Sequence, residues 1–162
     1  MFVLGIDPGL TRTGFGLVRR SRGGIEAVGA GVIRTEASTS TSTRLAELHE
    51  GLRSVVADHG PVEMAIETVF TNRNRATAIN VGRASGVAML VAGQAGIPVT
   101  EYTPTAIKLA VAGSGRADKK AVQMMVGRRL GLREAPRPAD AADALAIAIC
   151  HLQSLDLSMR TS

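Results

Sequence analysis

The chain has 162 residues, a length that fits one domain and is short for two. Its 19 Lys and Arg outnumber 14 Asp and Glu, and the resulting net charge of +5 favours a polyanionic partner, although solubility alone would also explain it. The single cysteine, Cys150, excludes an internal disulfide and a cysteine-rich zinc site and is expected to be a buried apolar side chain. We expect neither a signal peptide nor a membrane span, and therefore a cytoplasmic protein.

The N-terminal part of the chain predicts an antiparallel meander. Residues 2–7 form an apolar run that ends in the turn Asp7-Pro8-Gly9. A second run spans residues 13–18, and after the turn Arg22-Gly23-Gly24 a third spans residues 25–33. Three strands joined by such short turns are expected to pair with their neighbours in sequence.

Helices and strands alternate after the meander. Leucine and valine recur at helical spacing over residues 45–56, and this helix should end near Gly60-Pro61. Residues 62–70 predict a fourth strand, apolar except for its acids, as expected for a strand covered on both faces. A basic loop then leads to a helix over residues 76–95, and residues 96–102 predict a fifth strand.

The remaining residues predict three helices. Thr103-Pro104 is an N-cap followed by proline at the first helical position, opening a helix toward Val111. Further helices are expected over residues 117–130 and 140–155. We therefore expect a single domain over residues 1–156 and a short polar tail over residues 157–162.

This order of elements predicts an α/β fold with a mixed five-stranded sheet. The sheet combines an antiparallel meander with parallel strands, and helices cover both of its faces. The arrangement resembles the ribonuclease-H-like architecture.

Four carboxylates occupy positions where apolar residues would be more usual. Asp7 ends the first apolar run, Glu67 interrupts the fourth strand, and Asp140 and Asp143 lie three residues apart, on one face of the last helix. Acidic side chains are rarely buried unless they are paired or bind a metal. If the fold brings the four together, they form an oxygen-rich site for hard divalent cations.

Each acid also has a purely structural interpretation. Asp7 before Pro-Gly is a common turn former, and Asp140 suits helix capping. Asp143 lies deeper in its helix, before a wholly apolar stretch. Glu67 has no turn or cap to form, so its alternative is the solvated face of an edge strand.

A carboxylate site of this kind predicts metal-dependent phosphoryl transfer. Mg²⁺ binds through carboxylates and keeps positions for water and substrate phosphate. Two such ions would stabilise the attacking and leaving oxygens during phosphodiester hydrolysis by water. No nucleophile from the protein is then required.

Three motifs, in order along nearly the whole chain, resemble the RuvC family of crossover (Holliday) junction endodeoxyribonucleases. They are Gly5-Ile6-Asp7-Pro8-Gly9 with Thr13-Gly14-Phe15-Gly16, Ala65-Ile66-Glu67 with Val69-Phe70, and Ala139-Asp140-Ala141-Ala142-Asp143-Ala144-Leu145-Ala146. The resemblance implies a ribonuclease-H-like homodimer that nicks two opposing strands of a four-way DNA junction, in recombination and repair. It also implies Mg²⁺ or Mn²⁺ as cofactor, with two Mg²⁺ ions expected at each site, and work beside the branch-migration helicase proteins RuvA and RuvB.

The same resemblance assigns residue roles. It implies that the catalytic, metal-binding carboxylates are Asp7, Glu67, Asp140 and Asp143. It makes Phe70 an aromatic that stacks on a base near the junction centre, and it places Lys108 and Lys119 near the scissile phosphate. From their charge and position, we expect further DNA contacts from Arg73, Arg75, Arg116 and Lys120. Without the resemblance, Phe70 could equally be a core residue.

A two-fold dimer would match the two related strands of a four-way junction. Small residues on the predicted helix 76–95 would allow a second helix to approach closely, although packing inside one molecule explains them equally well. They are Gly82, Ala84, Ser85, Gly86 and Ala88.

Two other classes of protein compete with the nuclease interpretation. Sugar kinases and actin-like ATPases also carry an Asp-x-Gly turn before a Thr/Gly hairpin, but they need two such domains. A non-catalytic DNA-binding module is the second, and the four acids argue against it because they would repel phosphate without a cation.

Overall fold

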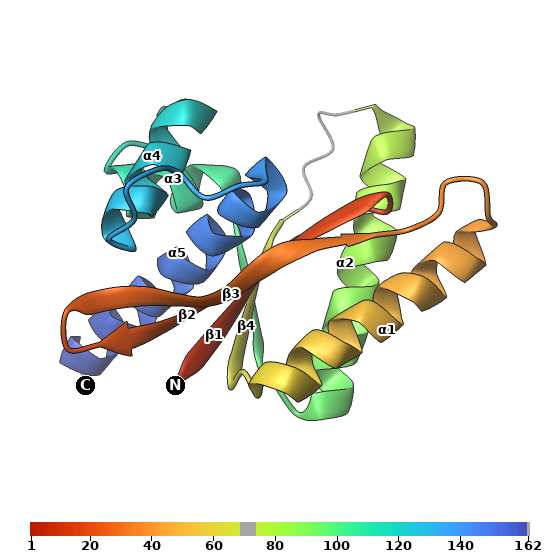
Figure 1. The fold of residues 1–162 in the computed structure, drawn as a ribbon, viewed down its shortest axis with the longest axis horizontal. Helices are drawn as coiled ribbons and strands as arrows, with labels where there is room; N and C mark the ends of the chain where they lie inside the picture. The colour runs from red at the N-terminus through yellow and green to blue at the C-terminus, as the bar shows by residue number, and fades with distance from the viewer. Residues whose placement is uncertain (69–73, 162) are drawn as a thin grey trace.

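The computed structural model describes residues 1–68 and 74–161. Its centre is a five-stranded mixed sheet, part of which is labelled in Figure 1. The strands are β1 (Phe2–Asp7), β2 (Arg12–Ser21), β3 (Gly24–Arg34), β4 (Glu63–Glu67) and β5 (Val99–Tyr102). Their spatial order is β3-β2-β1-β4-β5. β1, β2 and β3 pair antiparallel, whereas β4 runs parallel to both β1 and β5. The predicted mixed sheet with its antiparallel meander is confirmed.

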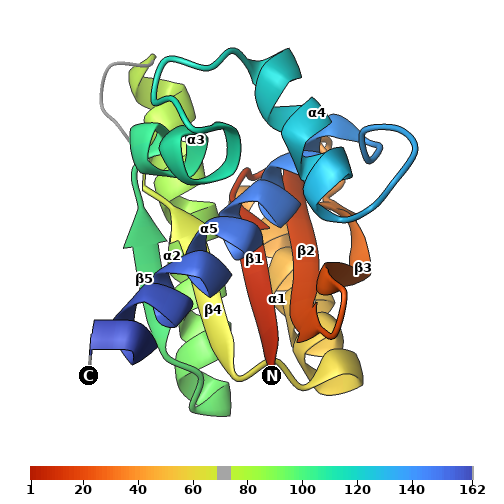
Figure 2. The same ribbon diagram turned by 90° about the vertical axis from the view of Figure 1, so that its left-hand side faces the viewer.

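Helices cover both faces of the sheet, also as predicted. They are α1 (Thr41–His59), α2 (Arg75–Ala95), α3 (Pro104–Ala112), α4 (Lys119–Arg129) and α5 (Ala139–Thr161). α1 and α2 lie on one face, and α5 crosses the other face together with α3 and α4 (Figures 1 and 2). Within the described residues, no helix has the length and apolar character needed to cross a membrane.

Alternating side chains of the strands supply two separate cores. Leu4 and Ile6 of β1 face α1 and α2, whereas Val3 faces α5 on the other side. Both cores are aliphatic and rich in alanine. Cys150 belongs to the α5 side and is 4% exposed, which confirms it as a buried apolar residue.

Capping residues explain several helix boundaries. The Thr103 side chain accepts a hydrogen bond from the Ala106 amide, and Pro104 is the first residue of α3, as predicted. β5 begins later than expected because Gly96, at φ 68°, ends α2 in the left-handed conformation.

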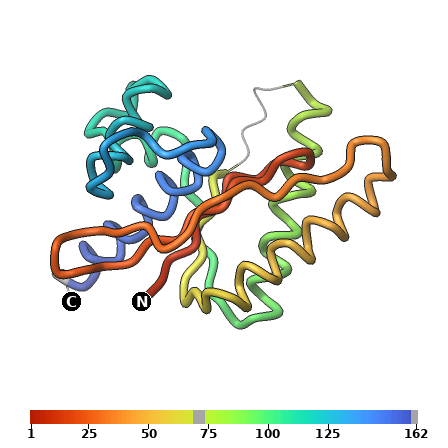
Figure 3. The backbone as a smooth tube through the Cα atoms, in the orientation of Figure 1, coloured from red at the N-terminus to blue at the C-terminus, as the bar shows by residue number. Residues whose placement is uncertain are grey.

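The last helix is longer than predicted. α5 continues through Thr161, so its expected end at Leu155 is wrong, and the predicted polar tail is helical as far as Thr161. The segment contains neither glycine nor proline, and polar side chains on an exposed helix do not by themselves end it. Arg20 near the end of β2 forms an ion pair with Asp156 of α5, and Figure 3 shows the β2–β3 hairpin extending beyond the rest of the sheet.

Glycines in the strands let α5 lie very close to the sheet. A Cβ at Gly5 would collide with the carbonyl oxygen of Ala144, and one at Gly14 would collide with that of Asp140. Only hydrogen at these positions permits the approach. The first turns of α5 are thereby held against β1 and β2.

Gly14→Ala is therefore expected to lower the free energy of unfolding by about 1–3 kcal/mol, because α5 must shift away from β2. Urea denaturation measures this loss. Gly23→Ala is the matched control, since a Cβ there meets no atom within 4 Å. An unchanged midpoint for Gly14→Ala would contradict close packing at this position.

Candidate active site

Three separate elements bring the four predicted carboxylates to one edge of the sheet. Asp7 is the last residue of β1, and Glu67 is the last residue of β4. Because β1 and β4 are parallel neighbours, their carboxyl ends lie side by side. Asp140 and Asp143 enter from the first turns of α5, which the strand glycines hold against the sheet.

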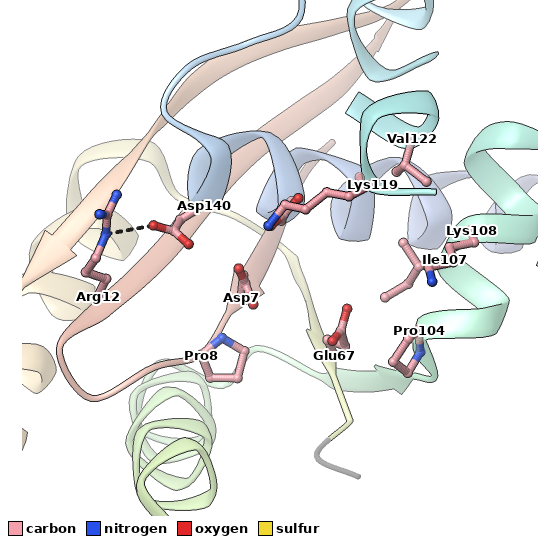
Figure 4. A pocket seen from close by; sticks show the side chains of 12 residues that line it. Asp7, Pro8, Arg12, Glu67, Pro104, Ile107, Lys108, Lys119, Val122 and Asp140 are labelled. Atoms are coloured by element: carbon pink, nitrogen blue, oxygen red, sulfur yellow. Dashed lines mark ion pairs between the residues drawn. The ribbon is translucent and has the colours of Figure 1, made fainter. Parts of the chain in front are cut away.

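Three of the acids form a compact cluster. One carboxylate oxygen from each of Asp7, Asp140 and Asp143 lies within 4.8 Å of the others. Glu67 lines the same cavity and faces Asp7 across it (Figure 4). The predicted grouping of four acids is therefore present, with Glu67 at the side of the cluster.

The cavity has a volume of about 400 Å³ and mixes charged and apolar walls. The acids lie beside the basic side chains of Arg12, Lys108 and Lys119. The other lining residues are Pro8, Pro104, Ile107, Val122 and Ala146. Opposite charges at the walls suit a ligand that combines a cation with an anion.

Burial and neighbouring negative charges both disfavour the ionised form of Asp7. Burial, followed by the negative charges of Asp143, Glu67 and Asp140, raises the pKa of Asp7 to about 7, although Lys119 opposes the shift. The cluster is thus short of positive charge, and a divalent cation would relieve the repulsion.

Two ion pairs partly neutralise the acids on α5. The Arg12 Nε lies 2.8 Å from Asp140 Oδ2 (Figure 4), and the Lys119 Nζ lies 2.9 Å from Asp143 Oδ2. The hydrogen bond to Asp143 also raises the pKa of Lys119. Asp140 lies inside the helix and pairs with Arg12, which does not favour its interpretation as a simple cap.

Arg12 was not singled out from the sequence. It follows the Asp7 turn by five positions, and its only signal there is a positive charge close to an acid. The antiparallel register that pairs Asp7 with Gly14 returns β2 past the site and so brings Arg12 into the cavity wall.

The predicted DNA-contacting residues occupy different places. Lys108 and Lys119 line the cavity, whereas Lys120 lines a second cavity on the outer side of α4. Arg75, the first residue of α2, and Arg116 are exposed and line neither cavity. Two further expectations lie outside the described residues: Phe70 and Arg73.

Known proteins resemble the chain over almost its full length. The family model described as crossover junction endodeoxyribonuclease RuvC matches residues 3–151. The RuvC of Syntrophomonas wolfei is 49% identical over 158 residues, which cover 98% of this chain and 92% of that protein. The RuvC of Chloroflexus aggregans is 51% identical over 151 residues, covering 93% of this chain and 92% of that one.

A solved structure agrees with these sequences. The structure of Thermus thermophilus RuvC in complex with a Holliday junction substrate has a TM-score of 0.91 and 37% identity, covering 98% of this chain and 96% of that chain. The ribonuclease-H-like fold predicted from the order of elements is confirmed by this match. The chain belongs to the RuvC family of crossover junction endodeoxyribonucleases.

Proposed function

We propose that this chain resolves four-way (Holliday) DNA junctions by paired nicks in opposing strands, using its four clustered carboxylates to hold Mg²⁺. The observation that carries the proposal is the approach of three carboxylates to within 4.8 Å in a cavity with basic walls. The proposed metal-binding and catalytic residues are Asp7, Glu67, Asp140 and Asp143.

The donor set fits Mg²⁺ or Mn²⁺ because it consists of carboxylate oxygens, with neither sulfur nor imidazole among the clustered residues. The raised pKa of Asp7 supports the fit, since burial and the three neighbouring acids both disfavour its ionised form and a bound cation would favour that form. Two bound ions would supply Lewis-acid stabilisation of the attacked phosphate and of the leaving oxygen.

The basic residues of the chain position the DNA. Lys119 reaches across the cavity to Asp143, so a phosphate entering there meets its ammonium group. Lys108 contributes a second positive charge from α3. We propose that Phe70 stacks on an unpaired base and that the remaining contacts come from Arg73, Arg75, Arg116 and Lys120.

Cleavage assays on three substrates test the proposal. Synthetic four-way junctions, linear duplexes and RNA–DNA hybrids are incubated with the protein, with and without Mg²⁺. We expect symmetric nicks in the junction only, and only with Mg²⁺. Cleavage of hybrids instead would indicate a ribonuclease H, and metal-independent nicking would overturn the role of the carboxylates.

Arg12→Ala is expected to tighten Mg²⁺ binding, because the guanidinium competes with the ion for Asp140. The expected gain is only about threefold, because the ion pair lies partly in solvent, where such pairs are weak. Isothermal titration calorimetry measures the affinity. Arg19→Ala is a matched control on the same strand, since Arg19 pairs with Glu26 away from the site. Equal affinities for Arg12→Ala and the unchanged protein would contradict the competition.

We also propose that α2 forms the interface of a homodimer. Gly82 and Gly86 would meet no atom with an added Cβ, and Ile79 and Leu90 are 55% and 54% exposed. Two such helices would pack closely through their glycines and bury these apolar side chains. Cooperation with RuvA and RuvB, and a cytoplasmic location, are proposed from the family resemblance.

Leu90→Glu is expected to convert the dimer to monomers at micromolar concentration, because it places a charge in the apolar contact. Sedimentation velocity measures the change. Leu157→Glu is the matched control, since Leu157 is 64% exposed at the end of α5. A Leu90→Glu protein that remains dimeric would exclude α2 as the interface.

A further inference from the structure

A second cavity, of about 710 Å³, lies on the outer side of α4. It is bounded by α4 and by the segment that leads into α5, and we call it the α4 groove. The groove and the active-site cavity share α4 and the start of α5 as walls. Lys119 lines the active site while Lys120 lines the groove, and Asp140 lines the active site while Ala139 lines the groove. Figure 2 shows α4 and this segment beside the start of α5.

The groove is strongly basic. Its lining includes Lys120, Arg128, Arg133 and Arg137, all exposed, against the single carboxylate of Glu134. None of these four cations forms an ion pair with another described residue. Such a concentration of positive charge attracts a polyanion.

The neighbouring Arg129 has a different role. Its guanidinium donates to the carbonyl oxygens of Val111 and Ala110, each at 2.9 Å, and so fastens α4 to α3. Positive charge on α4 is therefore divided: Arg129 supports the fold, whereas Lys120 and Arg128 in the groove are exposed.

The second wall of the groove is held in place by backbone contacts. The Leu132 amide donates to the Gly127 carbonyl at 2.9 Å, and the Ala141 amide donates to the Pro138 carbonyl at 3.1 Å. A Cβ on Gly127 would lie 2.9 Å from the Glu134 carbonyl oxygen, so the segment packs directly on α4. The cations are thus presented on a supported surface, which lowers the entropy lost on binding.

We propose that the α4 groove binds the phosphate backbone of a junction arm as it leaves the active site. The inference rests on the proposed function, because the groove shares α4 and the start of α5 with the cavity in which the scissile phosphate would lie. Met124 and Leu132, 49% and 45% exposed, would also suit an acidic amphipathic peptide. DNA is favoured because the groove shares α4 and the start of α5 with the cavity that would hold the scissile phosphate.

The first test measures the salt dependence of junction binding. Arg133→Gln and Arg137→Gln are combined in an Asp143→Asn background, so that cleavage does not interfere. For long-armed junctions we expect about tenfold weaker binding. The slope of log K against log salt concentration should also become smaller in magnitude by about 1–2 per protomer, because two phosphate contacts are lost. Junctions with arms too short to reach the groove should bind the double variant and its Asp143→Asn parent equally well.

The control removes the same charge elsewhere. Arg22→Gln and Arg53→Gln, in the β2–β3 turn and on α1, are combined in the same background. If the two double variants bind long-armed junctions with equal affinity and equal salt dependence, the proposal is overturned. An acidic protein segment would then be the remaining candidate to occupy the α4 groove. Cleavage by the unsubstituted protein is followed in parallel, so failure of the junction nuclease function is detected separately.

The second test maps the position of the arm. Because Cys150 is buried and its desolvation raises its pKa to about 11, an introduced cysteine is the only reactive thiol on the described surface. Leu132→Cys, carrying an iron chelate, should cut the labelled arm on one side of the nick site. Val28→Cys on β3 is the control and should give no localised cuts. Absence of localised cuts from Leu132→Cys would contradict the proposed path.

Discussion

Asp143→Asn is expected to lower the rate of junction cleavage by about 10³-fold or more, equivalent to roughly 4 kcal/mol of transition-state stabilisation. The substitution keeps the shape of the side chain and removes the charge that Asp143 contributes beside Asp7 and Asp140. It also leaves Lys119 without its carboxylate partner. Single-turnover kinetics on a labelled junction measure the rate.

Junction binding by Asp143→Asn should stay within a few fold of the unsubstituted protein, because less negative charge in the cavity does not weaken attraction for phosphate. Asp58→Asn is a matched control, since Asp58 is an exposed acid on α1 outside the cavity. Cleavage by Asp143→Asn at the original rate would remove this carboxylate from the proposed metal site.

Asp7→Asn is expected to stabilise the metal-free protein at pH 8 by roughly 2–4 kcal/mol. The folded pKa of Asp7 is about 7, against an ordinary value of 3.8. Between these values the folded state holds a proton that the unfolded state has released, so stability falls as pH rises and the loss is complete above pH 7. Asparagine does not ionise, so the Asp7→Asn protein does not lose this stability as the pH rises.

Urea denaturation in EDTA at pH 4, 6 and 8 measures the effect. The difference between Asp7→Asn and the unsubstituted protein should be small at pH 4 and largest at pH 8. Added Mg²⁺ should stabilise the unsubstituted protein most at pH 8, where Asp7 is ionised, and Asp7→Asn much less. Parallel stability curves for the two proteins across this range would contradict the raised pKa.

Local signals in the sequence predicted most of the secondary structure. The apolar run ending at Asp7 became β1, and Thr103-Pro104 opened α3, because turns and caps depend on neighbouring residues alone. The end of α5 was misplaced, because the polar residues after Leu155 were interpreted as a tail. Polarity describes exposure, whereas glycine and proline affect the backbone.

The small residues of α2 show what local signals leave open. Ala84, Ser85 and Ala88 are buried within the molecule, whereas Gly82 and Gly86 face open space. Both interpretations of these residues, internal packing and an external helix contact, had been equally consistent with the sequence. Only tertiary packing separates the two groups, because α1 and the sheet together cover one side of α2.

The sequence alone determined which acids were out of place, since charges within apolar runs have few structural explanations and Glu67 had the fewest. Their assembly was decided by tertiary structure. The parallel register of β1 and β4 aligns Asp7 with Glu67, and strand glycines let α5 bring its two acids to the same edge. Arg12 and the α4 groove depend on the same long-range packing, because neither is formed by residues adjacent in the chain.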